Sequence, residues 1–270
     1  MTGPRPRALS IAGSDPSGGA GIQADLKTFS ALGVYGMTAI TAITVQNTQG
    51  VSGVHAVSPS VVAAQIEAVA TDIGIDAAKT GMLANAGIVN AVADAVRQAR
   101  IGNLVVDPVS VSKHGHLLLE HDALDGLRSQ ILPLALLVTP NLPEAEALCG
   151  LTVRTRDDMR RAAHAILALG ATAVLVKGGH LAGGTAADLL ADPDGEEWLE
   201  AERIQTPHTH GTGCTLSAAI AAHLAMGEDL RTSVRAGKRF VTGAIARALA
   251  IGRGIGPVDQ LWMSARPDLS

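Results

Sequence analysis

The chain has 270 residues, of which 47% are hydrophobic and 2% aromatic, and its formal net charge at pH 7 is -4. This length accommodates one sizeable core packed with aliphatic side chains, and the mildly acidic balance without a Lys/Arg run argues against a nucleic-acid-binding protein. No apolar run is long enough for a membrane span or secretory signal. The two cysteines could pair, but an apolar core of this size does not need a disulfide, so we expect a cytoplasmic protein.

Short β-branched runs alternate with Ala-rich helical stretches along the chain, which predicts one domain over residues 1–270. Its sheet should be mostly parallel, with helices on both faces. Strands are expected at 7–12, 37–45, 51–57, 75–79, 103–107, 134–139 and 173–177. Helices are expected at 18–31, from 59, at 86–100, near 143, at 155–169, and twice toward the C-terminus. The helix at 155–169 should begin with a capping box formed by Thr155 and Asp158. Residues 185–191 and 198–204 flank the turn DPDG and predict an antiparallel hairpin at the sheet edge.

Polar residues follow six of the expected strands. Each group alone is explained by ordinary turn polarity. Together they predict a binding site, because ligands of open α/β sheets bind beyond the carboxyl ends of the strands. The groups are Gly13-Ser14-Asp15, Gln46-Asn47, Thr80-Gly81-Met82, Asp107, Asn141 and Lys177-Gly178-Gly179.

The stretch THGTGCTLSAAIAAHLA predicts a helix that begins at a Gly-Thr-Gly turn. Gly211, Thr212, Gly213 and Cys214 lie at its start. A helix start offers unpaired N–H groups and the positive end of the helix dipole, so it favours anions, and glycine lets a ligand approach the backbone. The simpler interpretation is a turn before a buried helix. The thiol favours a functional site, because a helix start can lower the pKa of a cysteine.

The glycine-rich stretch GSDPSGGAG, residues 13–21, matches neither of the two common phosphate-binding loops. It lacks the Gly-Lys-Ser/Thr of a Walker A loop, and its glycines do not follow G-x-G-x-x-G. The nine histidines show no spacing typical of a zinc site.

Several charged residues have both a functional and a structural explanation at this stage. Asp25 is explained as a solvated helix charge, and Asp107 either caps a turn or serves Mg²⁺ beside a phosphate. Glu144 either favours the start of a helix or serves metal or water in phosphoryl transfer. Lys177 is harder to explain structurally, since a lone cation at the end of a buried strand requires an anionic partner.

Taken together, these segments resemble the hydroxymethylpyrimidine/phosphomethylpyrimidine kinases of thiamin biosynthesis, a branch of the ribokinase-like superfamily. The resemblance extends from about residue 8 to 248, and its most specific blocks are the first and last of the list. The segments are GSDPSGGAGIQAD, AAKTGML, VVDPV, TPNLPEAEAL, VLVKGGH and THGTGC. It implies a ribokinase-like three-layer α/β/α sandwich, ATP-dependent phosphorylation of a pyrimidine alcohol and then of its monophosphate, a need for Mg²⁺, and a homodimer.

The resemblance also implies roles for individual residues. Asp25 and Gln46 would bond the amine and nitrogens of the pyrimidine ring, and Met82 and Val109 would contact its faces, in a pocket that also includes Gly13 and Ala20. Asp107, Asn141, Glu144 and Lys177 correspond to the nucleotide-phosphate and magnesium positions, with Asp107 and Glu144 nearest the metal. Gly211, Thr212, Gly213 and Cys214 correspond to the anion hole, where this branch has a cysteine in place of an aspartate base.

Two residues depart from the family pattern, and two other functions stay open. Ser110 and His116 lie in a flap where the family more often has methionine and a small or acidic residue. A pyridoxal kinase of the same branch is the nearest alternative, and Gln46 with the small Ala20 favours the pyrimidine. A non-catalytic metabolite-binding protein on this fold would not need the phosphate-binding residues.

Overall fold

The centre of the structure is an eight-stranded sheet in the order β10-β9-β8-β7-β6-β5-β1-β2. The computed structural model describes residues 5–109, 121–179 and 185–264. All pairings from β2 to β8 are parallel, and β9 and β10 form an antiparallel hairpin at one edge, as predicted. The strands are β1 Arg7–Ala12, β2 Tyr35–Ile40, β5 Ala77–Thr80, β6 Leu104–Val106, β7 Leu137–Val138, β8 Val174–Val176, β9 Thr185–Asp192 and β10 Gly195–Glu202.

Residues 37–45 do not form the single strand that the sequence predicts. The chain leaves the main sheet at the buried Thr41, whose hydroxyl donates to the carbonyl of Met82 at 2.6 Å. The segment beyond it, β3 (Ala42–Asn47), pairs instead with β4 (Gly50–Ala56) in a separate two-stranded sheet. A run of apolar and β-branched residues does not reveal such a change of partner, because both halves have the same strand pattern.

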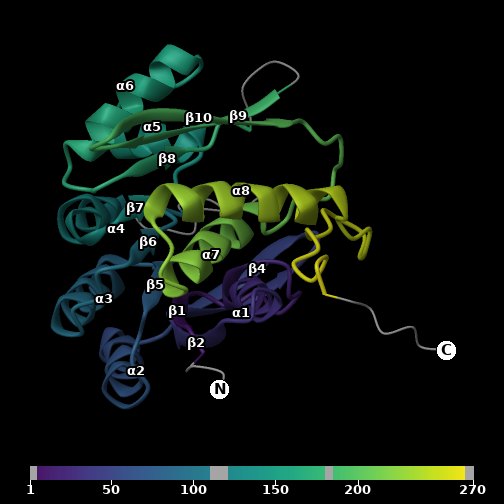
Figure 1. The fold of residues 1–270 in the computed structure, drawn as a ribbon. Helices are drawn as coiled ribbons and strands as arrows, with labels where there is room; N and C mark the ends of the chain where they lie inside the picture. The colour runs from purple at the N-terminus through teal and green to yellow at the C-terminus, as the bar shows by residue number, and fades with distance from the viewer. Residues whose placement is uncertain (1–4, 110–120, 180–184, 265–270) are drawn as a thin grey trace.

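Helices cover both faces of the sheet (Figure 1). The α-helices are α1 Gly21–Ala31, α2 Pro59–Asp72, α3 Ala86–Gln98, α4 His121–Gly126, α5 Leu142–Cys149, α6 Arg156–Leu167, α7 Thr212–Ala225 and α8 Leu230–Ala246. The predicted capping box of Thr155 and Asp158 is present at the start of α6. The helix expected from residue 18 begins at Gly21, after a loop closed by left-handed Gly18 and Gly21. Short π- and 3₁₀-helices, Leu127–Ile131 and Leu132–Leu134, were not predicted.

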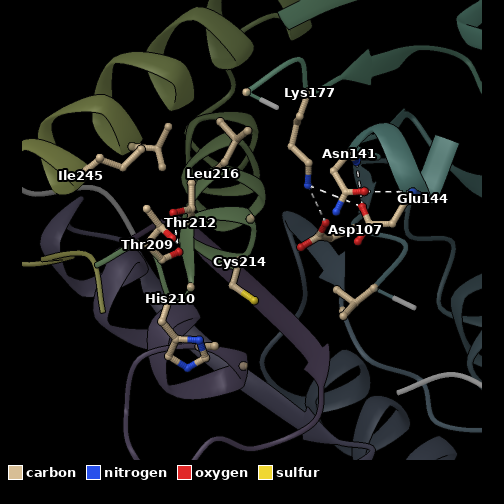
Figure 2. Close-up of a pocket in the computed structure, with 18 of the residues that line it drawn as sticks. Asp107, Asn141, Glu144, Lys177, Thr209, His210, Thr212, Cys214, Leu216 and Ile245 are labelled. Atoms are coloured by element: carbon tan, nitrogen blue, oxygen red, sulfur yellow. Dashed lines mark hydrogen bonds and ion pairs between the residues drawn. The ribbon is translucent and has the colours of Figure 1, made fainter. Parts of the chain in front are cut away.

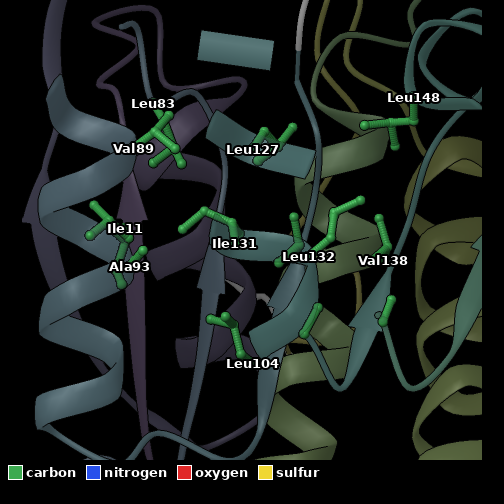
Figure 3. Close-up of a cluster of buried hydrophobic side chains, with 14 of the residues drawn as sticks. Ile11, Leu83, Val89, Ala93, Leu104, Leu127, Ile131, Leu132, Val138 and Leu148 are labelled. Carbon is green, nitrogen blue, oxygen red and sulfur yellow. The ribbon is translucent and has the colours of Figure 1, made fainter. Parts of the chain in front are cut away.

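Polar residues that follow the parallel strands, such as Asp107, Asn141 and Lys177, meet at one edge of the sheet, where a pocket opens (Figure 2). Gln46 also lines this pocket, but it lies within β3 of the separate sheet, whereas the sequence predicts a place after a strand of the parallel sheet. Each face of the sheet has its own apolar core. On one face, Ile11, Leu104 and Val138 pack with side chains from α2, α3, α5, α6 and the segment 123–135 (Figure 3). On the other face, α1, α7 and α8 supply the core with residues such as Phe29 and Leu216. This burial of both faces explains the nearly continuous apolar runs of the strands.

Among the described helices, none is both long enough and apolar enough to cross a membrane.

Candidate active site

A cavity of about 740 Å³ lies beyond the carboxyl ends of the parallel strands. Its volume is in the range of small-molecule sites. The structure brings all but one of the predicted site residues to its wall. Those that line it are Gly13, Ala20, Gln46, Met82, Asp107, Val109, Asn141, Glu144, Lys177, Gly211, Thr212, Gly213 and Cys214.

Asp25 is the exception, because it does not line the cavity and is not the solvated charge of the simpler interpretation. Its side chain is fully buried in an ion pair with Lys79, whose Nζ lies 3.1 Å from Oδ2, and it accepts a hydrogen bond from Ser10 at 2.5 Å. Burial would lower the pKa of Lys79, but the Asp25 carboxylate together with the other anionic groups near it, including Asp107, outweighs burial and holds the pKa above its usual value. The sequence does not indicate this pair, because Lys79 lies within a run that otherwise has the apolar pattern of a buried strand.

The phosphate-binding candidates gather around Lys177 on one side of the pocket (Figure 2). Its Nζ lies 3.2 Å from Asp107 Oδ1 and 3.9 Å from Glu144 Oε2, so the expected anionic partner is present. Burial lowers the pKa of Lys177, but the two carboxylates raise it above its usual value, so the ammonium is retained. A side chain added at Gly213 would lie 3.4 Å from this ammonium, so the start of α7 directly adjoins the cluster.

Asn141 and Glu144 form a capping box at the start of α5. The Asn141 side chain accepts from the N–H of Glu144 at 2.9 Å, and Glu144 Oε2 accepts from the N–H of Asn141 at 2.8 Å. The structural and functional explanations of Glu144 are therefore compatible, since this cap also faces the cavity. Glu144 is buried, and burial raises its pKa to about 7 with a further contribution from Asp107, while Lys177 opposes the shift.

The same cluster contains candidate ligands for a divalent cation. Within the described residues, no group of three or more His, Cys, Asp or Glu side chains is placed to hold a metal. Asp107 and Glu144 nevertheless bring two carboxylates to one wall beside Lys177. Mg²⁺ in phosphoryl-transfer sites takes one or two carboxylates, with water and substrate phosphates as its other ligands, so this pair fits Mg²⁺.

The helix α7 begins where the sequence predicts. Its cap, Gly211, is left-handed with φ 79°, and a side chain there would overlap the carbonyl oxygen of Gly19 in the glycine-rich loop. The Thr212 hydroxyl donates to the carbonyl of Thr209 at 2.8 Å. Only glycine adopts this left-handed conformation without strain and also leaves room for the carbonyl of Gly19, so the two glycine-rich segments pack directly against each other at the cavity.

The thiol of Cys214 lies in the pocket, but the expected lowering of its pKa is wrong. Burial raises the pKa to about 12, and the Lys79 ammonium reduces the shift. The negative charges of Asp25 and Asp107 add to the increase. The prediction depended on the helix start and the donors near it, whereas the removal of water around the sulfur is the larger effect.

The opposite end of the pocket joins the glycine-rich loop to the β3–β4 sheet. A side chain at Gly13 would lie 3.2 Å from the sulfur of Met82, so these two predicted residues adjoin. Gln46 lies between Thr44 and the buried His210. His210 and Asp15 also line this end. The sequence predicts only that His210 lines the loop before the anion site, and that Asp15 belongs to the polar group after the first strand.

A third part of the wall is apolar and was not predicted as a site. It combines Leu216 of α7 with Val241, Thr242 and Ile245 of α8. The sequence shows Val241 and Ile245 as one stripe of an amphipathic helix, which is equally typical of a core-facing surface. Ser110 and His116, where the chain departs from the family pattern, lie outside the described residues.

Comparisons with known proteins show the family to which the chain belongs. A family model described as phosphomethylpyrimidine kinase matches residues 15–259. A hydroxymethylpyrimidine/phosphomethylpyrimidine kinase from Rhizobium meliloti is 54% identical over 254 residues, covering 93% of this chain and 95% of its own. The enzyme of that name from Streptomyces coelicolor is 50% identical over 257 residues, covering 95% of each chain.

Solved structures show the same ribokinase-like architecture. An ADP complex of Bacillus subtilis pyridoxal kinase matches with a TM-score of 0.89 and 43% identity, over 95% of this chain and 98% of its own. A phosphomethylpyrimidine kinase from Clostridium difficile matches with a TM-score of 0.79 and 44% identity, over 88% and 99%. The chain belongs to the phosphomethylpyrimidine kinase family.

Proposed function

We propose that the protein phosphorylates 4-amino-5-hydroxymethyl-2-methylpyrimidine with ATP, and then phosphorylates the monophosphate to the diphosphate, in cytoplasmic thiamin biosynthesis. One observation carries the proposal: the start of α7 adjoins the Lys177–Asp107 pair in the same cavity that Gln46 and Met82 line. An anion site and a pocket for a small polar ring are thus joined, as transfer of a phosphoryl group to a ring alcohol requires.

The nucleotide would occupy the side of the cavity formed by α7, α8 and Lys177. The N–H groups at Gly211–Cys214 offer donors to the phosphates, and Lys177 supplies a cation that the carboxylates of Asp107 and Glu144 keep charged against the effect of burial. Asp107 and Glu144 would hold Mg²⁺, which would supply positive charge to the phosphate oxygens. The apolar wall of Leu216, Val241 and Ile245 suits the adenine ring, since small-molecule sites are predominantly apolar.

The ring would occupy the end formed by Gly13, Ala20, Gln46, Met82 and Val109. Gln46 offers one donor and one acceptor in a single plane, which matches a ring that carries an amine beside a nitrogen. Asp25 acts behind this wall, where it pairs with Lys79. Cys214 would lie between the ring and the phosphates, and it could receive the hydroxyl proton only as a thiolate, the form that the Lys79 ammonium favours. Because phosphoryl transfer depends mainly on positioning and charge stabilisation, the amides around the thiol carry the larger share of catalysis.

An ADP-release assay tests the proposal directly. The purified chain should turn over ATP with the pyrimidine alcohol and with its monophosphate. Gln46→Leu should weaken use of the pyrimidine roughly tenfold or more, because an unpaired ring group costs ~1–3 kcal/mol, while ATP affinity stays constant. No turnover with either pyrimidine would overturn the proposal.

A pyridoxal kinase is the second candidate, favoured by the likeness to pyridoxal kinases in fold and sequence. Among them is one from Staphylococcus aureus bound to an ATP analogue and pyridoxal, with a TM-score of 0.90 and 37% identity. Pyridoxal in the same assay separates the two functions. We expect the ratio of kcat/KM to favour the pyrimidine, and a ratio that favours pyridoxal would reverse the assignment.

We also propose a homodimer. One face of the β3–β4 sheet exposes Ile43 and Val45, with Val45 63% exposed. Exposed apolar groups of this kind mark interaction surfaces when they are contiguous. Sedimentation should give twice the chain mass, and Val45→Lys should shift it toward the monomer, whereas Leu261→Lys, a change at another exposed apolar residue, should not. A monomeric wild type would exclude the dimer.

A further inference from the structure

His210 and Asp15 form a buried contact that no step proposed above uses. The Nε2 atom of His210 lies 2.7 Å from Asp15 Oδ2, and the two side chains are 5% and 1% exposed. Burial favours the neutral acid, but hydrogen bonds from His210 and Ser17 outweigh it and hold the pKa of Asp15 at about 2. Asp15 is therefore an acceptor only, and the Nε2 atom must carry the proton that it donates.

The backbone holds both partners in place. The N–H of His210 donates to the carbonyl of Gly256 at 3.1 Å, and its own carbonyl accepts from Val258 at 3.1 Å. The Asp15 carboxylate also accepts hydrogen bonds from the N–H groups of Ser17 and Ala20, at 2.9 and 2.8 Å. The donor proton of Nε2 thus has one fixed direction.

Gln46 lies between this pair and Thr44. Its side-chain nitrogen is 3.4 Å from His210 Nε2, and its oxygen is 3.4 Å from Thr44 Oγ1. Because Nε2 of His210 carries the proton that it donates to Asp15, it has no lone pair for the Gln46 amide. At the first contact, therefore, two donors face each other, the Nε2–H group and the amide nitrogen. The single proton of Thr44 goes to the carbonyl of Ser14 at 2.8 Å, so two oxygens that act as acceptors face each other at the second contact.

A half-turn of the Gln46 amide removes both conflicts. The amide oxygen then faces the Nε2–H group of His210, and the amide nitrogen donates to a lone pair of Thr44. The neighbours of an amide define which end is oxygen, and here two independent neighbours select the same orientation.

We propose that His210 and Asp15 are positioning residues that fix the orientation of the Gln46 amide, and with it the order of donor and acceptor offered to the substrate ring. This inference rests on the proposed function, in that Gln46 contacts the ring. The fixed amide would make the pocket selective for the order of donor and acceptor on the ring as well as for ring size, since Gln46 could not rotate to suit a ring with the opposite order.

A pair of substrates with opposite polarity tests the inference. The aminopyrimidine alcohol presents an amine donor beside a ring-nitrogen acceptor. Its 4-oxo analogue, 5-hydroxymethyl-2-methylpyrimidin-4(3H)-one, has nearly the same shape but presents an oxygen acceptor beside a ring N–H donor. The readout is the ratio of kcat/KM for the two alcohols, measured with wild type, His210→Leu and His210→Gln.

Wild type should favour the amino substrate strongly, and His210→Leu should reduce the ratio by roughly tenfold or more, the value of one mispaired hydrogen bond. His210→Gln should retain most of the discrimination, because its amide still donates a proton. The matched control is His208→Leu. His208 accepts from the N–H of Gly256 at 3.0 Å within the same loop and should leave the ratio unchanged.

The outcomes are distinguishable. If His210→Leu lowers kcat/KM for both alcohols equally, or merely lowers the melting temperature with the ratio intact, His210 is structural and the inference is overturned. If wild type uses neither alcohol, the proposed function fails first. If Gln46→Leu leaves the ratio at its wild-type value, Gln46 does not read the ring and the inference is again overturned.

Discussion

Lys79 and Asp25 form an ion pair with both side chains fully buried, 3.1 Å apart, directly behind the cavity wall. A side chain at Gly81, which lines the cavity, would lie 3.2 Å from the Lys79 ammonium. The charge of this pair therefore acts on the pocket without contact to solvent.

Removal of one member of the pair should destabilise the fold. Lys79→Met leaves a buried carboxylate unpaired, and the free energy of unfolding should fall by about 3–5 kcal/mol in urea titration. Adding Asp25→Asn removes the unpaired charge and should recover part of the loss. Equal stability of the single and double variants would show that the ion pair is not the cause.

Glu144 should make stability depend on pH. Its pKa is raised from 4.5 to about 7 in the folded protein, so between these values the folded chain binds a proton that the unfolded chain has released. Stability should therefore decrease as pH rises from about 4.5 through about 7. Glu144→Gln should flatten this part of the profile, measured by urea unfolding between pH 5 and 8 in the absence of nucleotide.

The same carboxylate should couple to metal. Mg²⁺ binds the ionised form, so half-maximal turnover should require more Mg²⁺ below pH 7 than above it. Glu144→Gln should raise the requirement at every pH and remove its pH dependence. A pH-independent requirement in wild type would place the metal elsewhere.

Cys214 should react slowly for a cysteine in an active site. With a pKa of about 12, its alkylation by iodoacetamide should accelerate steadily as pH rises to 10 without reaching a plateau. Cys149, which is also partly exposed, is the internal reference for mass-spectrometric mapping. A plateau near neutral pH would mean that a thiolate exists in the free protein.

Loss of the thiol should still affect catalysis. Cys214→Ala should reduce turnover by about 10²–10⁴, the range for a positioned base, while ATP binding at the amides persists. Full activity would exclude proton transfer through the sulfur.

Gly211→Ala should damage the site beyond ordinary backbone strain. Gly211 and Gly33 are both left-handed, with φ values of 79° and 75°, but only Gly211 faces a carbonyl oxygen at van der Waals overlap. Gly33→Ala should destabilise by about 1 kcal/mol, whereas Gly211→Ala should lose more and also weaken ATP binding. The melting temperature and ATP affinity of the two variants, measured by calorimetry, separate the effect of backbone strain from that of steric overlap. Identical changes in the two variants would contradict the close packing of Gly211 against the glycine-rich loop.

The sequence predicted the parts of this molecule that local patterns determine. The edge hairpin, the capping box of Thr155 and the start of α7 depend on residues within a few positions of one another, and all three are confirmed. The location of the cavity was also predictable, because parallel strands bring their carboxyl ends to the same edge of the sheet whatever the order of the strands.

The parts that were missed depend on contacts between distant segments. The Asp25–Lys79 pair joins residues 54 positions apart, and the His210–Asp15 pair joins residues 195 apart. The shift in the Cys214 pKa is of the same kind, because it depends on how much water the surrounding elements exclude. Local patterns contain no information on such burial.

The sheet order has a consequence for synthesis of the protein. The first strand made, β1, lies between β2 and β5, and the loop that follows it rests against Gly211 and against Gln260, whose amide donates to the carbonyl of Gly19 at 3.2 Å. A ribosome must therefore release nearly the whole chain before the glycine-rich loop finds its final neighbours. A nascent chain that stalls after β10 would contain all eight strands of the main sheet, but its pocket would lack the wall formed by α7 and α8. It would expose to chaperones and proteases the face of the sheet that these two helices later cover.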